Sequence, residues 1–188
     1  MKAKIIQAKW AGLSAGILTA LCLFTATTQR ALADDPSGQL SGKDYKFASA
    51  ATEGARHESA LGSLAVQKAS STAVRDFGQK MIDDHDKANA ELGKLLTMKG
   101  ATVPDAKKED KLMKRLQGLT GTAFDMAYIK AMVADHKKDV KEFTKASEKC
   151  DDPDLRAWAT KTLPIVQEHL RIAMDIENSP GFITASTK

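Results

Sequence analysis

From Asp44 onward the apolar residues recur every three or four positions, and no stretch shows the apolar–polar alternation of a half-buried strand. A charged segment over residues 105–117 keeps this spacing and predicts a short connecting helix. Four longer amphipathic segments surround it, so the sequence predicts an all-α four-helix bundle. These long helices are expected at about 44–69, 72–100, 123–149 and 153–178.

Helix-capping residues support these boundaries. Ser41 and Asp44 have the spacing of an N-terminal capping motif before the first long helix. Asp152 is an expected N-cap for the last long helix, because Pro153 fits the first helical position, where its missing N–H costs nothing. The breakers at 179–181 end that helix.

The N-terminal segment has the three parts of a secretory signal. Lysines lie within residues 1–9, an uncharged and mostly apolar run follows over 10–26, and Ala31-Leu32-Ala33 supplies a small-x-small cleavage site. We therefore expect residues 1–33 to be a signal peptide and the chain to be periplasmic or secreted. The alternative is an uncleaved signal that anchors the chain in the inner membrane, although a span needs about 20 apolar residues.

Charge excludes one class of partner. The chain has 28 Lys and Arg against 24 Asp and Glu, but four of the basic residues and no acid lie within 1–33. The remainder carries 24 of each sign, so it lacks the basic surface of a nucleic-acid-binding protein. The sequence has no glycine-rich phosphate-binding loop, so nucleotide binding is not expected. No transmembrane span is expected after the signal is removed.

The exported part is expected to be one domain. Residues 34–43 are polar and rich in helix breakers, which predicts a flexible leader, residues 44–178 form the bundle domain, and 179–188 are a C-terminal tail. Cys22 leaves with the signal, so Cys150 is the only remaining thiol and no intramolecular disulfide is possible. Cys150 is then an unpaired surface thiol or forms an intermolecular bridge; a further protein partner and the oligomeric state are unknown.

Each long helix carries one mid-length polar residue on its apolar stripe. Glu58 lies in line with Leu61 and Ala65 of the first helix, and a histidine takes the corresponding place in the other three. Burial of such groups without partners would cost several kcal/mol. The four candidate site residues are Glu58, His85, His136 and His169.

Distance from the helix ends predicts that these four residues meet. Glu58 lies about 13 residues before the turn at Ser70-Ser71 and His85 about 14 after it, and His136 and His169 are similarly level about the turn near 151. The linker over 101–120 is a short end connection or a crossover along the bundle. Either topology brings the four residues into one layer.

Two hypotheses explain a buried layer of three imidazoles and a carboxylate. The first is a site for one divalent transition metal, Zn²⁺, Fe²⁺ or Mn²⁺, bound by Glu58, His85, His136 and His169. The second is a hydrogen-bonded polar layer that only fixes helix register, in a non-catalytic envelope protein that is structural or binds a partner. The Glu-x-x-His signature of di-iron carboxylate proteins does not occur, which disfavours two-metal oxygen chemistry.

Other polar residues have weaker patterns. An acid precedes each stripe histidine, and because adjacent helix positions point about 100° apart, Asp84, Asp135 and Glu168 are either solvated or orient a histidine of the next helix. His57 lies off the stripe and is expected at the surface. Asp125 is on the core stripe but in a different layer, so a helix-capping role is expected.

Several spaced motifs resemble a known family. They are Phe47-Ala-Ser-Ala-Ala-Thr-Glu-Gly with Glu58, Val74-Arg-Asp-Phe with Met81-Ile-Asp-Asp-His85, Gly121-Thr-Ala-Phe-Asp125 with His136, and Leu163-Pro164 with His169-Leu170. Over about residues 43–177 the chain resembles the bacterial domain-of-unknown-function family 4142. The resemblance implies an exported, ferritin-like four-helix bundle with the crossover topology, in a protein often labelled a membrane or outer-membrane protein. It implies no established activity, and His57 is an addition to the pattern.

Overall fold

The computed structural model describes residues 37–105, 111–180 and 182. In this part of the chain there are five α-helices and no strand. The predicted all-α class is therefore confirmed, with the short helix between the second and third long ones. The helices are α1 (Gly42–Lys68), α2 (Thr72–Met98), α3 (Lys111–Gln117), α4 (Gly121–Lys149) and α5 (Pro153–Glu177).

The predicted capping residues begin α1 and α5. Ser41 is the N-cap of α1, and its hydroxyl accepts a hydrogen bond from the backbone N–H of Asp44 at 3.2 Å. Asp152 is the N-cap of α5, and its carboxylate accepts from two backbone N–H groups of the first turn at 2.9 and 3.0 Å. Pro153 takes the first helical position as expected.

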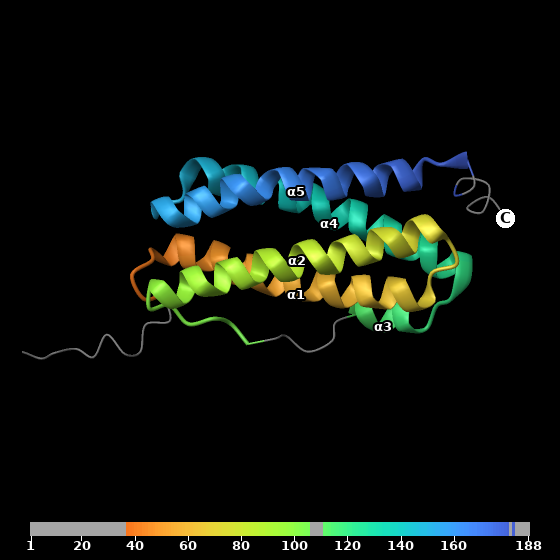
Figure 1. Cartoon of the computed structure of the whole chain (residues 1–188), viewed down its shortest axis with the longest axis horizontal. Coiled ribbons are helices and arrows are strands. Elements are labelled where there is room, and N and C mark those ends of the chain that lie inside the picture. The colour runs from red at the N-terminus through yellow and green to blue at the C-terminus, as the bar shows by residue number, and fades with distance from the viewer. Residues whose placement is uncertain (1–36, 106–110, 181, 183–188) are drawn as a thin grey trace, which may run out of the picture. The chain divides into compact units, whose positions relative to one another are not determined.

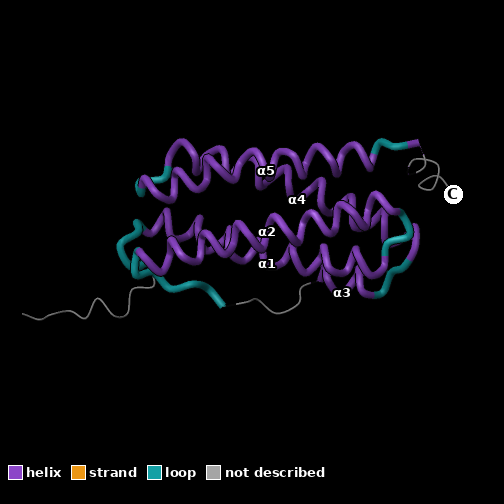
Figure 2. The backbone as a smooth tube through the Cα atoms, in the orientation of Figure 1, coloured by secondary structure: helices purple, strands orange, loops and turns teal. Residues whose placement is uncertain are grey.

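The helices form two antiparallel hairpins joined by a crossover (Figure 1). α1 packs along α2 and α4 along α5, while α2 also contacts α5 and α1 contacts α4. α2 ends at the opposite end of the bundle from α3 and the start of α4, so the linker between them crosses its length (Figure 2). This is the ferritin-like crossover, one of the two topologies that the sequence allows.

Two glycines set the close packing of α1 against α2. A Cβ atom added at Gly62 would lie 2.6 Å from the carbonyl oxygen of Gly78, and one added at Gly78 would lie 2.9 Å from the oxygen of Gly62. Neither position tolerates a side chain without movement of backbone. Gly62 lies four residues after Glu58 and Gly78 lies seven before His85, so this contact fixes the two helices beside the predicted polar layer.

The apolar core has two clusters, one toward each end of the bundle. The cluster near the α1–α2 turn is built from large side chains of all four long helices and α3, among them Leu61, Phe77, Met81, Tyr128 and Met132. The other cluster lies toward the start of α1 and the α4–α5 turn, and includes Leu40, Leu92, Leu96, Leu155 and Trp158. Along each long helix, the predicted polar residue lies between the members of these clusters.

The leader and Cys150 pack differently from what the sequence predicts, and the C-terminal tail adds one buried residue. The described part of the expected leader packs on the bundle, since Leu40 is buried and the backbone N–H of Gln39 donates to the Lys99 carbonyl at 2.9 Å. In the expected tail, Phe182 is buried against the first core cluster. Cys150 is a buried free thiol at the end of α4, because it packs with Leu155 in the second cluster, so the surface expectation was wrong.

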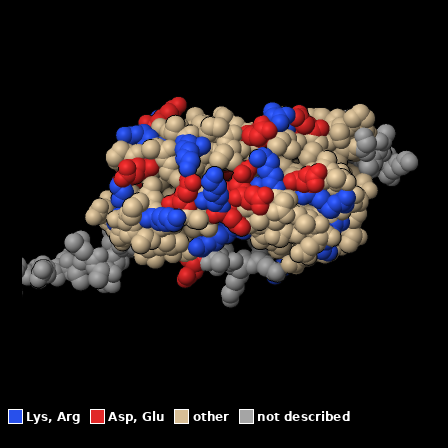
Figure 3. Space-filling view, in the orientation of Figure 1, with Lys and Arg blue, Asp and Glu red and all other residues tan. Residues whose placement is uncertain are grey.

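The surface carries interspersed charges of both signs. On the face of Figure 3, Lys and Arg side chains alternate with Asp and Glu across the middle of the bundle. This mixture agrees with the balance of charges outside residues 1–33. None of the described helices has an apolar run long enough to cross a membrane, and the expected signal peptide, 1–33, lies outside the described residues.

Candidate metal centre in the bundle core

The structure brings the three predicted histidines together in the bundle core, and it places Glu58 beside His136 in a second group of potential ligand atoms with Asp139. Each comes from a different long helix, Glu58 from α1, His85 from α2, His136 from α4 and His169 from α5. Their exposed fractions are 6%, 8%, 0% and 0%, respectively. One nitrogen from each histidine lies within 4.8 Å of the other two, so the three rings face a common point.

The hydrogen bonds of two rings define which nitrogen carries a proton. His136 Nδ1 lies 3.0 Å from the Met132 carbonyl oxygen, which can only accept, so Nδ1 is the donor. His169 Nε2 lies 2.8 Å from the Asp84 carboxylate and is likewise the donor. In neutral rings the other two nitrogens, His136 Nε2 and His169 Nδ1, then carry lone pairs, and they face each other at 3.4 Å.

Burial keeps these histidines neutral. Desolvation, reinforced by the neighbouring imidazoles, lowers the pKa of His85 to about 3. Desolvation and His169 together lower the pKa of His136 to about 4. Burial also lowers the pKa of His169, although its hydrogen bond to Asp84 acts in the opposite direction. Three uncharged imidazoles with available lone pairs are the form in which histidine binds a metal ion.

Glu58 lies between two of the rings without being satisfied by them. Its Oε2 lies 3.5 Å from His85 Nε2 and its Oε1 lies 3.4 Å from His136 Nδ1. Neither Glu58 Oε1 nor His85 Nε2 has a hydrogen-bond partner in the described structure. Burial, followed by the charges of Asp139 and Asp135, raises the pKa of Glu58 well above its ordinary value. The layer thus contains an acceptor and a ring nitrogen that the chain leaves unpaired.

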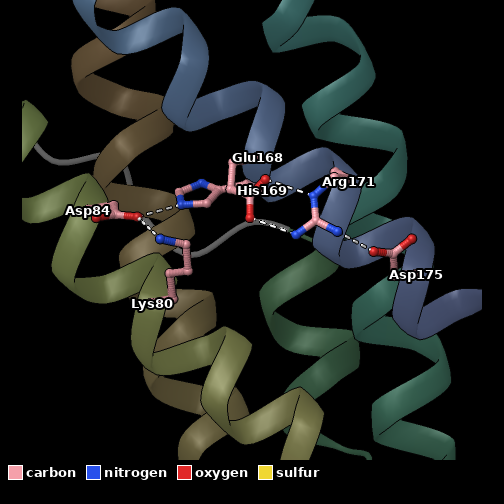
Figure 4. Close-up of polar contacts among 6 residues, drawn as sticks. All are labelled: Lys80, Asp84, Glu168, His169, Arg171 and Asp175. Atoms are coloured by element: carbon pink, nitrogen blue, oxygen red, sulfur yellow. Dashed lines mark hydrogen bonds and ion pairs between the residues drawn. The ribbon is translucent and has the colours of Figure 1, made fainter.

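One of the three acids that precede the histidines orients a histidine of the next helix. Asp84 of α2 accepts from His169 of α5 at 2.8 Å and from Lys80 at 2.9 Å, as Figure 4 shows. Partial burial acts to raise the pKa of Asp84, but the hydrogen bonds from Lys80 and His169 lower it below its usual range. Asp84 is therefore ionised and holds His169 with Nδ1 turned toward the other rings.

The other two acids are paired at the surface. Glu168 accepts from both Arg171 Nε and a terminal guanidinium nitrogen at 2.8 and 2.7 Å, and Arg171 also bonds Asp175 (Figure 4). Asp135 forms an ion pair with Lys138 at 3.2 Å. For these two residues the solvated alternative from the sequence describes the structure better.

Asp139 belongs to the layer but is absent from the predicted set. A carboxylate oxygen of Asp139 lies within 4.8 Å of ligand atoms of Glu58 and His136. Burial and the nearby Asp135 raise the pKa of Asp139 to about 6, and a hydrogen bond joins its carboxyl group to that of Glu58. Asp139 follows His136 by three residues, so the two side chains are neighbours on α4, but this spacing alone does not distinguish Asp139 from the other acids of that helix.

The remaining polar candidates lie elsewhere. His57 is half-buried and belongs to neither group of potential ligand atoms found among the described residues. Asp125 has the expected capping role, since its carboxylate accepts from the backbone N–H groups of Ser70 and Ser71 at 3.0 and 2.9 Å and from the Ser70 hydroxyl at 2.5 Å. It joins the start of α4 to the start of α2.

Fold and site together define an all-α bundle protein with a histidine–carboxylate cluster in its core. The sequence matches the model of a protein family described as a domain of unknown function, DUF4142, over residues 29–176. The chain belongs to this family, which confirms the resemblance seen in its motifs. No curated protein matches the sequence.

Two solved crystal structures have a similar fold. The "putative secreted protein DUF305" from Streptomyces coelicolor is 14% identical, with a TM-score of 0.63 over 71% of this chain and 90% of that one. A DUF305 fragment from Deinococcus radiodurans is 10% identical, with a TM-score of 0.66 over 73% of this chain and 96% of the fragment. At these identities the likeness concerns the fold alone.

Proposed function

We propose that the domain binds one divalent transition metal, Zn²⁺, Fe²⁺ or Mn²⁺, in the core of the bundle. His85, His136 and His169 supply imidazole nitrogens and Glu58 supplies a carboxylate oxygen. Nitrogen and carboxylate donors of this kind suit all three ions. The biochemical activity that such an ion would serve is uncharacterised.

The contact between His136 and His169 carries this proposal. The two facing nitrogens, 3.4 Å apart, both hold lone pairs, so neither can donate a hydrogen bond to the other. Two nitrogens bound to one tetrahedral ion at about 2.0–2.1 Å lie about 3.3 Å apart. A cation between the two nitrogens would therefore turn an unfavourable contact into two coordinate bonds with little movement of either ring.

The surrounding groups support the same assignment. Asp84 and the Met132 carbonyl accept the outer N–H groups of His169 and His136, an arrangement that orients metal-bound imidazoles and increases their basicity. Glu58, whose pKa is raised by burial, would release its proton when the ion binds. Glu58 Oε1 lies beside His136 Nδ1, the nitrogen that donates to Met132, so the carboxylate would have to turn toward the ion. The ion would then give Glu58 Oε1 and His85 Nε2 the partner that they lack.

Metal analysis and thermal melting test the proposal. We expect the chain purified without chelator to contain about one equivalent of metal, and the EDTA-treated chain to melt higher after Zn²⁺, Fe²⁺ or Mn²⁺ is added. Free metal at about 100 times the dissociation constant would add about 2.7 kcal/mol to the free energy of unfolding. The variant His136→Ala should lose this shift, whereas the matched control His57→Ala should keep it.

The opposite result would favour the second hypothesis. If no metal is bound and melting is unchanged by all three ions, the layer is a structural device that fixes helix register. The domain would then be a non-catalytic envelope protein, and its surface rather than its core would bind any partner.

We also propose that the chain is exported and that residues 1–33 are removed. The charged, apolar and small-x-small parts of the N-terminal sequence support this proposal. Mass spectrometry of the protein from the periplasmic and secreted fractions should give Asp34 as the first residue. A membrane-bound chain that retains Met1 would instead support an uncleaved anchor in the inner membrane.

A further inference from the structure

A cavity of about 740 Å³ lies between the two helical hairpins and reaches the histidine layer. Its wall includes side chains of α1, α2, α4 and α5. His85, His169 and Glu58 line it, whereas His136 does not, so the predicted metal ligands are approached from this side. The volume is within the range of about 300–1,000 Å³ that is typical of pockets for small organic ligands.

Small residues on α1 create this space. The part of α1 that faces the cavity has a run of short side chains, and α2 adds Ala88 opposite. Gly54 is the clearest of them, because a Cβ atom added there would meet no atom within 4 Å. At the other end of the same helix pair, Gly62 and Gly78 leave no room at all. The lining residues of this kind on α1 are Gly42, Ala50, Ala51, Gly54 and Ala55.

The cavity has chemically different ends. Away from the histidines, three aromatic side chains form a contiguous wall, with the ring centroids of Phe47 and Phe143 5.4 Å apart and those of Phe143 and Trp158 5.6 Å apart. At the histidine layer the lining is polar, with the imidazoles of His85 and His169. A molecule that filled the space would meet aromatic surface along its body and metal ligands at one end.

We propose that this cavity binds a small amphipathic organic molecule with an apolar, preferably aryl, body and an oxygen-donor head group that ligates the metal. This inference rests on the proposed metal site. The head group would take a fifth coordination position beside the three imidazoles and Glu58. Zinc sites become five-coordinate in some complexes, and Mn²⁺ accommodates this coordination number more readily. The aryl body would bury apolar surface against the aromatic wall.

The charge of the polar end makes this binding depend on the metal. Besides Glu58, the acids Asp84 and Asp139 line the cavity with His85 and His169. Without a cation, the ionised Asp84 and the lone pairs that His136 and His169 turn toward each other disfavour a further oxygen lone pair beside them. The aryl body alone then contributes affinity, and the metal adds the head-group interaction.

The test uses benzohydroxamate as the probe and the purified full chain, prepared without metal or loaded with Zn²⁺. Isothermal titration calorimetry would measure its binding to the EDTA-treated and the Zn²⁺-loaded forms of the wild type, Gly54→Leu and Gly93→Leu. Gly54→Leu fills the cavity and replaces a helical glycine with a better helix former. Gly93→Leu makes the same change in α2, where added atoms also meet open space but outside the cavity lining.

We expect the Zn²⁺-loaded wild type to bind the probe at least about tenfold more tightly than the metal-free form, a factor that corresponds to about 1.4 kcal/mol. Gly54→Leu should bind the probe about tenfold or more weakly than the wild type does. The variant should melt at or above the wild-type temperature and still bind Zn²⁺. Gly93→Leu should bind the probe as the wild type does.

Two outcomes would overturn the inference, and they are distinguishable. If Zn²⁺ binds but the probe binds neither form, or binds Gly54→Leu unchanged, the cavity is not a ligand site and the metal proposal stands. If the probe binds equally with and without Zn²⁺ because no Zn²⁺ binds, the proposed function fails, and the metal-ligating head group fails with it.

Discussion

Two of the buried carboxylates on the long helices, Asp125 and Glu58, differ in how far the chain satisfies them. Asp125, 3% exposed, accepts three hydrogen bonds from the backbone and hydroxyl groups of Ser70 and Ser71. Glu58, 6% exposed, has an oxygen with no hydrogen-bond partner and lies 3.4–3.5 Å from two imidazole nitrogens. Both residues interrupt an apolar stripe in the sequence, yet their surroundings differ completely.

The difference separates a structural polar group from a candidate ligand. A buried carboxylate that receives three donors from the chain gains more by staying in place than by binding anything else. A buried carboxylate beside neutral imidazoles, with a shared proton and an orphan oxygen, costs free energy until a cation arrives. The comparison therefore predicts that changes at the two sites act with opposite sign on the stability of the metal-free protein.

The largest expected effect is at Asp125. Asp125→Ala leaves the buried N–H groups of Ser70 and Ser71 without acceptors, and the free energy of unfolding should fall by about 3 kcal/mol. Urea denaturation of the EDTA-treated protein measures this loss, and the stabilisation by added Zn²⁺ should persist. A loss below about 1 kcal/mol would show that water replaces the carboxylate, and the contrast with Glu58 would weaken.

The pH dependence of the metal-free protein tests the histidine layer next. The folded-state pKa values of His85 and His136 are lowered to about 3 and 4, so protonation below the unfolded value of about 6.5 favours unfolding. This contribution to stability is present above that value and is lost as pH falls toward the folded values. Between pH 7.5 and 5.5, each histidine that stays neutral in the folded protein lowers the free energy of unfolding by about 1.4 kcal/mol.

Two carboxyl groups act in the opposite direction. The raised pKa of Glu58 and the pKa of about 6 of Asp139 make these groups stabilise the folded state as pH falls, since they take up protons that the unfolded chain does not hold. These gains offset part of the loss from the histidines between pH 7.5 and 5.5, so stability should still fall over this interval. Urea denaturation in EDTA of the wild type and of Glu58→Leu, which lacks the Glu58 carboxyl group, measures the fall, and a flat profile in Glu58→Leu would mean that the histidines are solvated.

Substitution of Asp84 should have a smaller effect, on the affinity for Zn²⁺, because Asp84 orients the ligand His169. Asp84→Asn removes the carboxylate that fixes the tautomer of His169, and the dissociation constant for Zn²⁺ should rise about tenfold. The matched control is Glu168→Gln, an acid-to-amide change next to His169 whose side chain bonds only surface residues. Competition with a chromophoric chelator measures both affinities. Equal affinities in the two variants would contradict a positioning role for Asp84.

Much of the bundle and its polar layer follow from apolar periodicity. Glu58, His85, His136 and His169 interrupt their stripes at matching distances from the turns, and helix geometry carries that match into space. The crossover could not be derived this way, because His85 and His136 are level in either topology. The resemblance to the family supplied it, and the path of the chain in Figure 1 agrees.

Features set by side-chain placement between helices were not predicted. Asp139 lies off the stripe of α4 and joins the layer only because α1 brings Glu58 against it. Cys150 and Leu40 lie in polar stretches of sequence, yet both are buried where the ends of several helices meet. The Met132 carbonyl decides which nitrogen of His136 faces the centre, and Asp84 decides this for His169. The apolar periodicity of the sequence does not reveal such single acceptors.

The smallest expected effect, at Glu58, has the opposite sign to that at Asp125. Glu58→Leu removes a desolvated carboxyl group and places apolar atoms beside the cavity, so the metal-free protein should gain about 1 kcal/mol in its free energy of unfolding at pH 7.5. The same variant loses an oxygen ligand, and its stabilisation by Zn²⁺ should shrink. Asp125→Leu is the matched control and should destabilise the protein.

Urea denaturation of both variants, with EDTA and with saturating Zn²⁺, separates the two contributions. In EDTA, we expect Glu58→Leu to have a higher free energy of unfolding than the wild type, because the buried carboxyl group destabilises the metal-free protein. On addition of Zn²⁺, the variant should be stabilised less than the wild type, because it has lost a ligand. A loss of stability in EDTA would mean that the imidazoles satisfy Glu58 as fully as Ser70 and Ser71 satisfy Asp125, and the layer would then be a structural network.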